Sequence, residues 1–311
     1  MPVCRASAPS GGGAIVIGSP GVGPLSALLA LVSSLLWGTS DFLGGTASRR
    51  IPVSGVLGTA QLVALLGLVP LALVTGELHH DRGYLLPAVA AGLVGLVALA
   101  AFFRALSVGT MGVVAPIAAL GVVIPVGVGL VQGESPTAVQ LLGLVVAIVG
   151  VVLASGPELS GGAGRAPLLL AAVAAAGFGT VIALVAAGSR GPGGSVLMTL
   201  LTMRLTAVLV LTALLVARAL RAGGKAQRWE IGVRRTDVPL LAAIGIGDVA
   251  ANATFAVASQ TGLVSVTAAL ASLYPVVTAL LAYRFHAERL RPVQLVGVAA
   301  AILGAGLLAA G

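Results

Sequence analysis

Long apolar runs, separated by short polar connections, make up most of this chain. Each run is continuous and is close to the roughly 20 residues that a helix needs to cross a bilayer. A backbone in lipid must satisfy its own hydrogen bonds, which favours helices, and the alternating pattern of a membrane β-barrel is missing. The pattern predicts ten transmembrane helices, at residues 25–47, 54–75, 84–107, 111–131, 137–155, 166–188, 195–217, 238–259, 263–283 and 292–310.

The landmarks of the first five runs recur in the same order in the last five. The stretch VQLLGLVVAIVGVVLA begins at Val139, and VQLVGVAAAILGAGLL begins at Val293. Near the front of each half, Trp-Gly-Thr at 37–39 matches Phe-Gly-Thr at 178–180. Because five is an odd number of spans, the second copy must enter the membrane from the opposite side. The sequence therefore predicts an inverted repeat, which is common among secondary transporters.

This repeat divides the chain into four parts. We expect a disordered leader at 1–24, a first five-helix repeat at 25–155, a linker at 156–165 and a second five-helix repeat at 166–311. Basic residues gather in the connections on one predicted side, above all in the loop 218–237. The rule of positive inner loops would then place both termini outside the cytoplasm.

Composition supports the same class. Of the 311 residues, 58% are hydrophobic and only 8% are charged, against about 25% charged in a soluble domain. We therefore expect an all-α polytopic membrane protein of the cell membrane, of the bacterial plasma-membrane type. The net charge of +8 fits membrane topology better than nucleic-acid binding. Because Cys4 is the only cysteine and no phosphate-binding motif is present, we expect no disulfide, metal, ATP or other cofactor.

Four charged residues fall inside the predicted spans: Asp41, Arg104, Arg204 and Asp248. Charges at membrane depth are costly, so they are expected to face a cavity or a partner. Their depths suggest two pairs, Asp41 with Arg104 and Arg204 with Asp248. Each pair could instead be a static bridge between helices, and Arg104 could extend to the membrane interface.

Polar and aromatic residues accompany the two acids. Trp37, Ser40 and Asp41 share one face of their helix, and Asn252 lies one turn after Asp248. An acid in a polar cavity can exchange protons, so we take Asp41 and Asp248 as candidates for proton coupling. Three prolines within the predicted spans are candidate helix breaks: Pro116, Pro125 and Pro275.

Other motifs point less strongly to function. The stretch ELHHDRG at 77–83 holds two histidines and two acids, but a solvated turn is the better interpretation. Glu134 and Glu288 lie near predicted helix ends. Acidic side chains stabilise the N-terminus of a helix, so we expect both residues to act as caps.

Three stretches resemble the EamA-type members of the drug/metabolite transporter superfamily. They are ASLYPVVTALLAYRFHAERLRPVQLVGVAAAILGAGLLA at 271–309, LLWGTSDFLGGTASRR at 35–50 and FFRALSVGTMGVVAPIAAL at 102–120. The chain departs from the family in reading Ala287-Glu288 where Gly-Glu is usual, and in stopping at Gly311 without a basic tail. Members are usually drawn with both termini inside, against the charge count, so the orientation stays open.

The resemblance implies ten helices in two inverted repeats around a central cavity. It also implies a secondary transporter, commonly an exporter of amino acids or other small metabolites, that works by alternating access and uses protons. Its partners would be the bilayer and a small solute. Within this interpretation we take Arg104 as a candidate site for an anionic group of the solute. The implied pathway residues are Trp37, Ser40, Asp41, Arg104, Phe178, Asp248, Asn252 and Tyr274.

Two other classes remain open from the residues alone. A membrane-embedded enzyme acting on lipid-linked substrates would need a convergent acid and histidine site, which only 77–81 offers. A structural or regulatory membrane protein would use the charges of the spans as static pairs. Exchanging the charges of a pair separates these cases, because a static pair should tolerate the exchange and a coupling acid should not.

Overall fold

A computed structural model describes residues 23–79, 82–109, 111–154, 165–221, 232–286 and 292–310. Within these residues all regular structure is helical, which confirms the predicted all-α class. Eight helical stretches are long and apolar enough to cross a membrane, one of which, Val264–Phe285, is interrupted. The apolar helical stretches Ile117–Val131 and Ala138–Leu153 are shorter. Most of the expected leader and the expected linker lie outside the described residues, and so does Glu288.

The helices follow the order of the apolar runs. Those of the first half are α1 (Pro24–Ser48), α2 (Val53–Thr75), α3 (Leu85–Val108), α4 (Met111–Ala119), the 3-10 turn η3 (Leu120–Val122), α5 (Val123–Val131) and α6 (Ala138–Ala154). Those of the second half are α7 (Arg165–Arg190), α8 (Val196–Arg221), α9 (Val238–Thr261), α10 (Val264–Ala271), α11 (Tyr274–His286) and α12 (Pro292–Ala310). Short 3-10 turns at Glu77–His79, Arg82–Tyr84 and Arg235–Asp237 lie in the connections.

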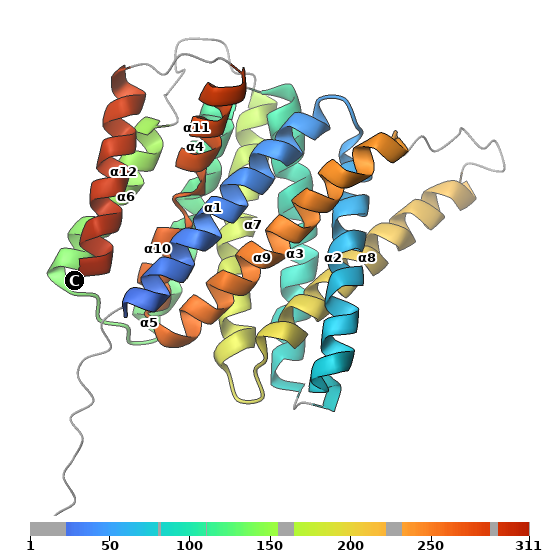
Figure 1. Ribbon diagram of the computed structural model, residues 1–311, viewed down its shortest axis with the longest axis horizontal. Coiled ribbons are helices and arrows are strands. Elements are labelled where there is room, and N and C mark those ends of the chain that lie inside the picture. Colours follow the sequence, from blue (N-terminus) through green and yellow to red (C-terminus); the bar gives the residue numbers. More distant parts are fainter. Residues whose placement is uncertain are drawn as a thin grey trace, which may run out of the picture.

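The two halves pack against each other in matching pairs. In Figure 1, α1 rises through the view and α7 descends, so the two repeats run in opposite directions. Helix α1 packs on α9 as α7 packs on α3, and α2 packs on α9 as α8 packs on α3. The pairs α6–α12 and α2–α8 lie at the two ends of the bundle (Figure 1). Exchanging the two halves leaves this set of contacts unchanged, as an approximate two-fold axis requires.

Small residues let these helices approach closely. A Cβ added at Gly92 of α3 would lie 2.6 Å from the carbonyl oxygen of Met203 in α8. At the matching contact, Gly245 of α9 lies against the carbonyl group of Ala60 in α2. Membrane helices lack a hydrophobic driving force between them and associate through such close packing. Glycines of both repeats therefore lie where the repeats meet.

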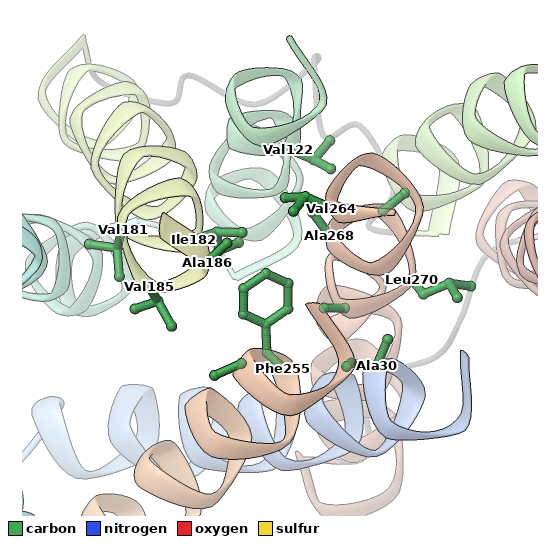
Figure 2. Close-up of a cluster of buried hydrophobic side chains, with 14 of the residues drawn as sticks. Ala30, Val122, Val181, Ile182, Val185, Ala186, Phe255, Val264, Ala268 and Leu270 are labelled. Carbon is green, nitrogen blue, oxygen red and sulfur yellow. The ribbon is translucent and has the colours of Figure 1, made fainter. Parts of the chain in front are cut away.

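The largest buried cluster joins elements of both halves (Figure 2). Phe255 of α9 is fully buried in it and points toward Ile182 and Ala186 of α7. The outer surface also carries large apolar side chains, with Val74 86% and Leu86 80% exposed. Apolar surface of this extent is unfavourable in water and is suited to lipid.

Two of the predicted spans are interrupted helices. The segment with α4 and α5 changes to a 3-10 turn at η3, and Pro125 follows in the first turn of α5. The second interruption separates α10 from α11, immediately before Pro275. Pro116 was expected to break its helix, but the helix α4 continues through it. One proline removes a single backbone donor, which a packed membrane helix can tolerate.

Candidate functional site

A central cavity lies between the two halves and is lined by residues of α1, α2, α3, α7, α8, α9 and α11. About 620 Å³ of space is free of protein atoms there, part of it open to the surroundings. The polar and aromatic lining residues are Trp37, Asp41, Gln61, Phe178, Arg204, Asp248, Asn252 and Tyr274. The other lining residues are Ala91, Gly92, Gly95, Leu96, Leu99, Val181, Ile182, Met203 and Ala207.

Arg204 connects three helices at the wall of this cavity. Its Nη2 lies 2.5 Å from Asp248 Oδ2, so the predicted pair of these residues is present. Its Nη1 donates a hydrogen bond of 2.7 Å to Gln61 Oε1 on α2. Arg204 is only 2% exposed and Gln61 4%. A buried charge needs both an opposite charge and hydrogen-bond acceptors, and this arrangement supplies them.

Asn252 supports Asp248 from the next turn of α9. Its Nδ2 donates to the backbone oxygen of Asp248 at 2.7 Å and to Asp248 Oδ1 at 3.3 Å. The Asp248 carboxylate therefore has Arg204 on one oxygen and Asn252 on the other. It is positioned by its neighbours and is 21% exposed.

Asp41 faces the same cavity from α1, but unlike Asp248 it has no partner for its carboxylate among the described residues. Its residue exposure is 9%, and within the described part of the chain no hydrogen bond or ion pair is formed by its carboxylate. The charges of Asp41 and Asp248 are near enough to repel each other. A second, smaller cavity continues from Asp41, Gln61 and Asp248 and is lined also by Ser40. Asp41 thus lines both cavities.

Aromatic side chains complete the walls. The Trp37 ring lies 6.0 Å, centroid to centroid, from Phe255, and Phe178 contacts Phe102 edge-on at 5.3 Å. Tyr274 is 6% exposed, and its hydroxyl has no hydrogen-bond partner among the described residues. Its hydroxyl is near enough to Asp41 for an electrostatic interaction. Tyr274 therefore has an unused donor close to the unpaired acid.

Arg104 does not belong to this site, which corrects the expectation from the sequence. Its side chain is exposed, it does not line the cavity, and no ion pair between it and Asp41 is present in the described residues. Leu99 lines the cavity from the same helix, and a residue five positions later lies about 140° further around a helix of 3.6 residues per turn. The rotation of α3 therefore turns Arg104 away from Asp41.

Gln61 was not among the predicted site residues. The available signal was a lone amide within an otherwise apolar run, which is costly in a membrane unless it is bonded. Such a signal identifies a polar contact but not its partner. Only the packing of α2 on α8 shows that the partner is Arg204.

Glu134 forms a second polar cluster, at the end of the bundle where α5 ends. Its Oε1 and Oε2 accept hydrogen bonds from the backbone N–H groups of Val264 at 2.7 Å and Ser265 at 2.9 Å. Arg190 of α7 lies 3.6 Å from Glu134 Oε1 and also donates to the carbonyl oxygen of Gly262. Glu134 therefore caps a helix start, as expected, but that helix is α10 of the other repeat.

The acidic and histidine-containing turn near residue 80 has one described polar contact. Ser195 Oγ donates a hydrogen bond of 2.5 Å to Glu77 Oε2, which joins this turn to the start of α8. His80 and Asp81 lie outside the described residues. Among the residues that are described, no group of three or more potential metal ligands was found.

Known structures share this arrangement of helices. One solved structure, titled only as the crystal structure of a protein, superposes with a TM-score of 0.67 at 19% sequence identity. The match covers 91% of this chain and 95% of the other. At this identity the likeness concerns the fold alone. No curated protein sequence matches the chain at a significant level.

The family is established by a match along nearly the whole chain. The sequence model of the EamA-like transporter family matches twice, at residues 24–156 and 165–310. The two matches correspond to the two halves seen in the helix packing. The apolar helices, the two repeats and this double match together identify a multi-pass membrane protein. The chain belongs to the EamA-like transporter family.

Proposed function

We propose that this protein is a secondary active transporter that moves a small solute through the central cavity by alternating access. The observation that carries the proposal is the position of the cavity, which lies where two antiparallel repeats meet and is lined by charged residues of both. In such folds the two repeats can exchange conformations around one central site. We propose ten spans in the cell membrane, with α4–η3–α5 and α6 completing the eight longer helices.

The solute is a small metabolite or an amino-acid-like molecule, and the direction is export, as the family resemblance implies. Phe178, Trp37 and Tyr274 provide aromatic walls for it. The interrupted helix at α10 and α11 begins its second part at Tyr274, beside the cavity. A broken helix next to a solute site is a recurrent feature of transporters, because it can bend there.

Proton coupling is assigned to Asp41 in this proposal, with Asp248 as its electrostatic neighbour. Asp41 is buried and faces the cavity without a partner among the described residues, so its carboxyl can gain or lose a proton as the cavity changes its access. Asp248 already contacts Arg204 and Asn252 and is better placed to hold Arg204. Acids at membrane depth that face a cavity commonly serve as proton sites.

Flux through purified protein in proteoliposomes tests the proposal. Amino acids, nucleosides and amines would be offered on one side, with a pH difference of either sign across the membrane. We expect a solute whose accumulation follows the pH difference in the wild type and not in Asp41→Asn. Asp237→Asn is the control, because Asp237 lies in a turn away from the cavity. If Asp41→Asn transports with unchanged pH dependence, proton coupling through Asp41 is wrong.

A structural role for the charges is the second candidate, and the Arg204–Asp248 contact favours it for that pair. The double exchange Arg204→Asp with Asp248→Arg distinguishes the two. Flux retained in the double variant, and lost in each single one, indicates a static pair.

A further inference from the structure

The charges in the central cavity do not balance. Three charged side chains line it: Asp41, Arg204 and Asp248. Arg204 and Asp248 are in contact at 2.5 Å and cancel each other. This leaves the Asp41 carboxyl, which is buried and unpaired within the described residues. A solute with one positive charge would complete the balance, whereas an anion would be repelled by the Asp41 carboxylate.

The part of the cavity wall that α3 and α7 supply is apolar. Aligning Trp37 with Phe178, as the repeat requires, places Asp41 opposite Ile182 in the other half. Ile182 lines the cavity, together with Leu96 and Leu99 of α3. The two repeats thus contribute unlike surfaces to one chamber. A ligand that fits both must carry a charged group at one end and an apolar body at the other.

We infer that the solute is an organic cation with an apolar body, whose cationic group contacts the Asp41 carboxylate while its body lies against Leu99, Phe178 and Ile182. This inference rests on the proposed transport function and, among the solutes proposed for the same cavity, selects a cationic metabolite over a zwitterionic amino acid. Trp37 and Tyr274 are placed beside Asp41, and their ring faces attract cations.

Arg204 is not available to a solute carboxylate. Its side chain is only 3% exposed, and both Asp248 and Gln61 contact its guanidinium. Its Nε makes no hydrogen bond within the described residues, but it is covered by surrounding atoms. A zwitterion could reach Arg204 only by displacing Asp248, which would leave a buried carboxylate without its partner. Such unpaired charges are strongly destabilising.

One consequence is competition between the solute and a proton at Asp41. When the cation binds, the carboxylic acid releases its proton to water, and the charge of the occupied site is unchanged. The titratable group that faces Asp41 from α9 is Asp248, with Arg204 behind it on α8, and from α11 it is Tyr274. Helices α2 and α10 contain no titratable residue, and the only one on α3, Arg104, is exposed.

Four ligands with one phenyl body test the inference. They are phenethyltrimethylammonium, phenylalanine, 3-phenylpropionate and 2-phenylethanol, which share a phenyl group on a two-carbon chain and carry a cationic, zwitterionic, anionic or neutral head. Binding to purified detergent-solubilised protein would be measured by calorimetry at two pH values. Comparing buffers with different ionisation enthalpies counts the protons released.

We expect the cation to bind at least about tenfold more tightly than the other three ligands, which corresponds to about 1.4 kcal/mol. Its affinity should fall as the pH is lowered, with release of about one proton when Asp41 is protonated beforehand. Asp41→Asn should weaken binding by about tenfold or more, Asp41→Glu should restore much of it, and Asp237→Asn should change nothing. The quaternary head carries no proton of its own, so the released proton must come from the protein.

The outcomes separate this inference from the proposed function. Tight binding of phenylalanine without binding of the cation overturns the inference, and leaves transport intact if phenylalanine flux is observed. Cation binding that depends on Asp41 without any flux in proteoliposomes supports the cation site and contradicts transport. Cation binding that is equal in wild type and folded Asp41→Asn overturns the inference, and so does binding of none of the four ligands.

Discussion

Removing the carboxylate of Glu134 should weaken the junction between the two repeats at the end of α5. The side chain accepts two hydrogen bonds from the first N–H groups of α10 and pairs with Arg190 of α7. The variant Glu134→Ala removes all three contacts at once. The affected N–H groups belong to Val264 and Ser265, which are 3% and 2% exposed, so water cannot readily replace the lost acceptor.

The structure sets the size of the effect. A hydrogen bond to a charged group contributes about 1.5–3 kcal/mol to stability. The Arg190 side chain is 30% exposed, so the ion pair adds no more than about 0–1 kcal/mol. Partial relaxation of the turn can expose one N–H to water. We therefore expect the free energy of unfolding to fall by about 2–4 kcal/mol in Glu134→Ala.

Equilibrium unfolding by sodium dodecyl sulfate in mixed detergent micelles measures this difference, followed by far-ultraviolet circular dichroism. Glu134→Gln keeps one amide oxygen as an acceptor and loses the charge, and should lose about 1–2 kcal/mol. Glu77→Gln is the matched control, because Glu77 is also an acid in a connecting turn but keeps an acceptor for Ser195. The reasoning is refuted if Glu134→Ala costs less than about 0.5 kcal/mol, the range of ordinary surface substitutions.

Four further predictions use the same unfolding measurement. Gln61→Leu leaves Arg204 Nη1 without its acceptor and should cost about 1–3 kcal/mol, and a neutral result would mean that water replaces the amide. Arg204→Met should cost about 3–5 kcal/mol, and adding Asp248→Leu should recover part of that loss, because a buried ion pair is destabilised most when one partner is left alone. Gly150→Leu should separate α6 from α12 and cost about 1–3 kcal/mol, since a Cβ there would lie 2.7 Å from the Cα of Ala301. Gly127→Ala, which meets nothing within 4 Å, should be neutral or stabilising by about 0.5–1 kcal/mol, and a large loss there would contradict the packing argument.

The sequence predicted the helices well because lipid leaves little choice. A run of apolar residues that crosses a membrane must satisfy its backbone within itself, so its length and continuity are sufficient to indicate a helix. The order of landmarks in the two halves likewise indicated the duplication that the double family match bears out. Neither inference needs any knowledge of how one helix is rotated against another.

Candidate site residues were predictable from the sequence where a charged side chain interrupts an apolar run. The free-energy cost of placing that charge in lipid does not depend on which helices pack around it. Asp41 and Asp248 interrupt apolar runs, and both line the cavity. Arg104 interrupts a run in the same way and is exposed. The rule that charges face the interior applies to the middle of a span, whereas a long side chain near a helix end can reach the interface.

The polar partners that a side chain finds on other helices were not predictable from the sequence, except where two charged residues lie at similar depths in the membrane on adjacent helices. Arg204 and Asp248 lie at similar depths on adjacent helices, and they do pair. Gln61 and Glu134 have partners that are far away along the chain, on α8 and α10. Which of several polar groups at a given depth become neighbours depends on which faces of the helices meet.

The sequence by itself determined that this chain forms apolar helices in two related halves, because hydrophobic length and repeat order are properties of the chain alone. The tertiary structure decided which residues share the cavity, because the rotation and crossing of each helix are set by close packing, as at Gly92 on Met203 and Gly245 on Ala60. That packing brings Gln61 to Arg204, turns Arg104 away and leaves Asp41 facing the cavity without a partner among the described residues. A small shift in helix rotation changes such neighbours completely, while it leaves the apolar pattern of the sequence unaltered.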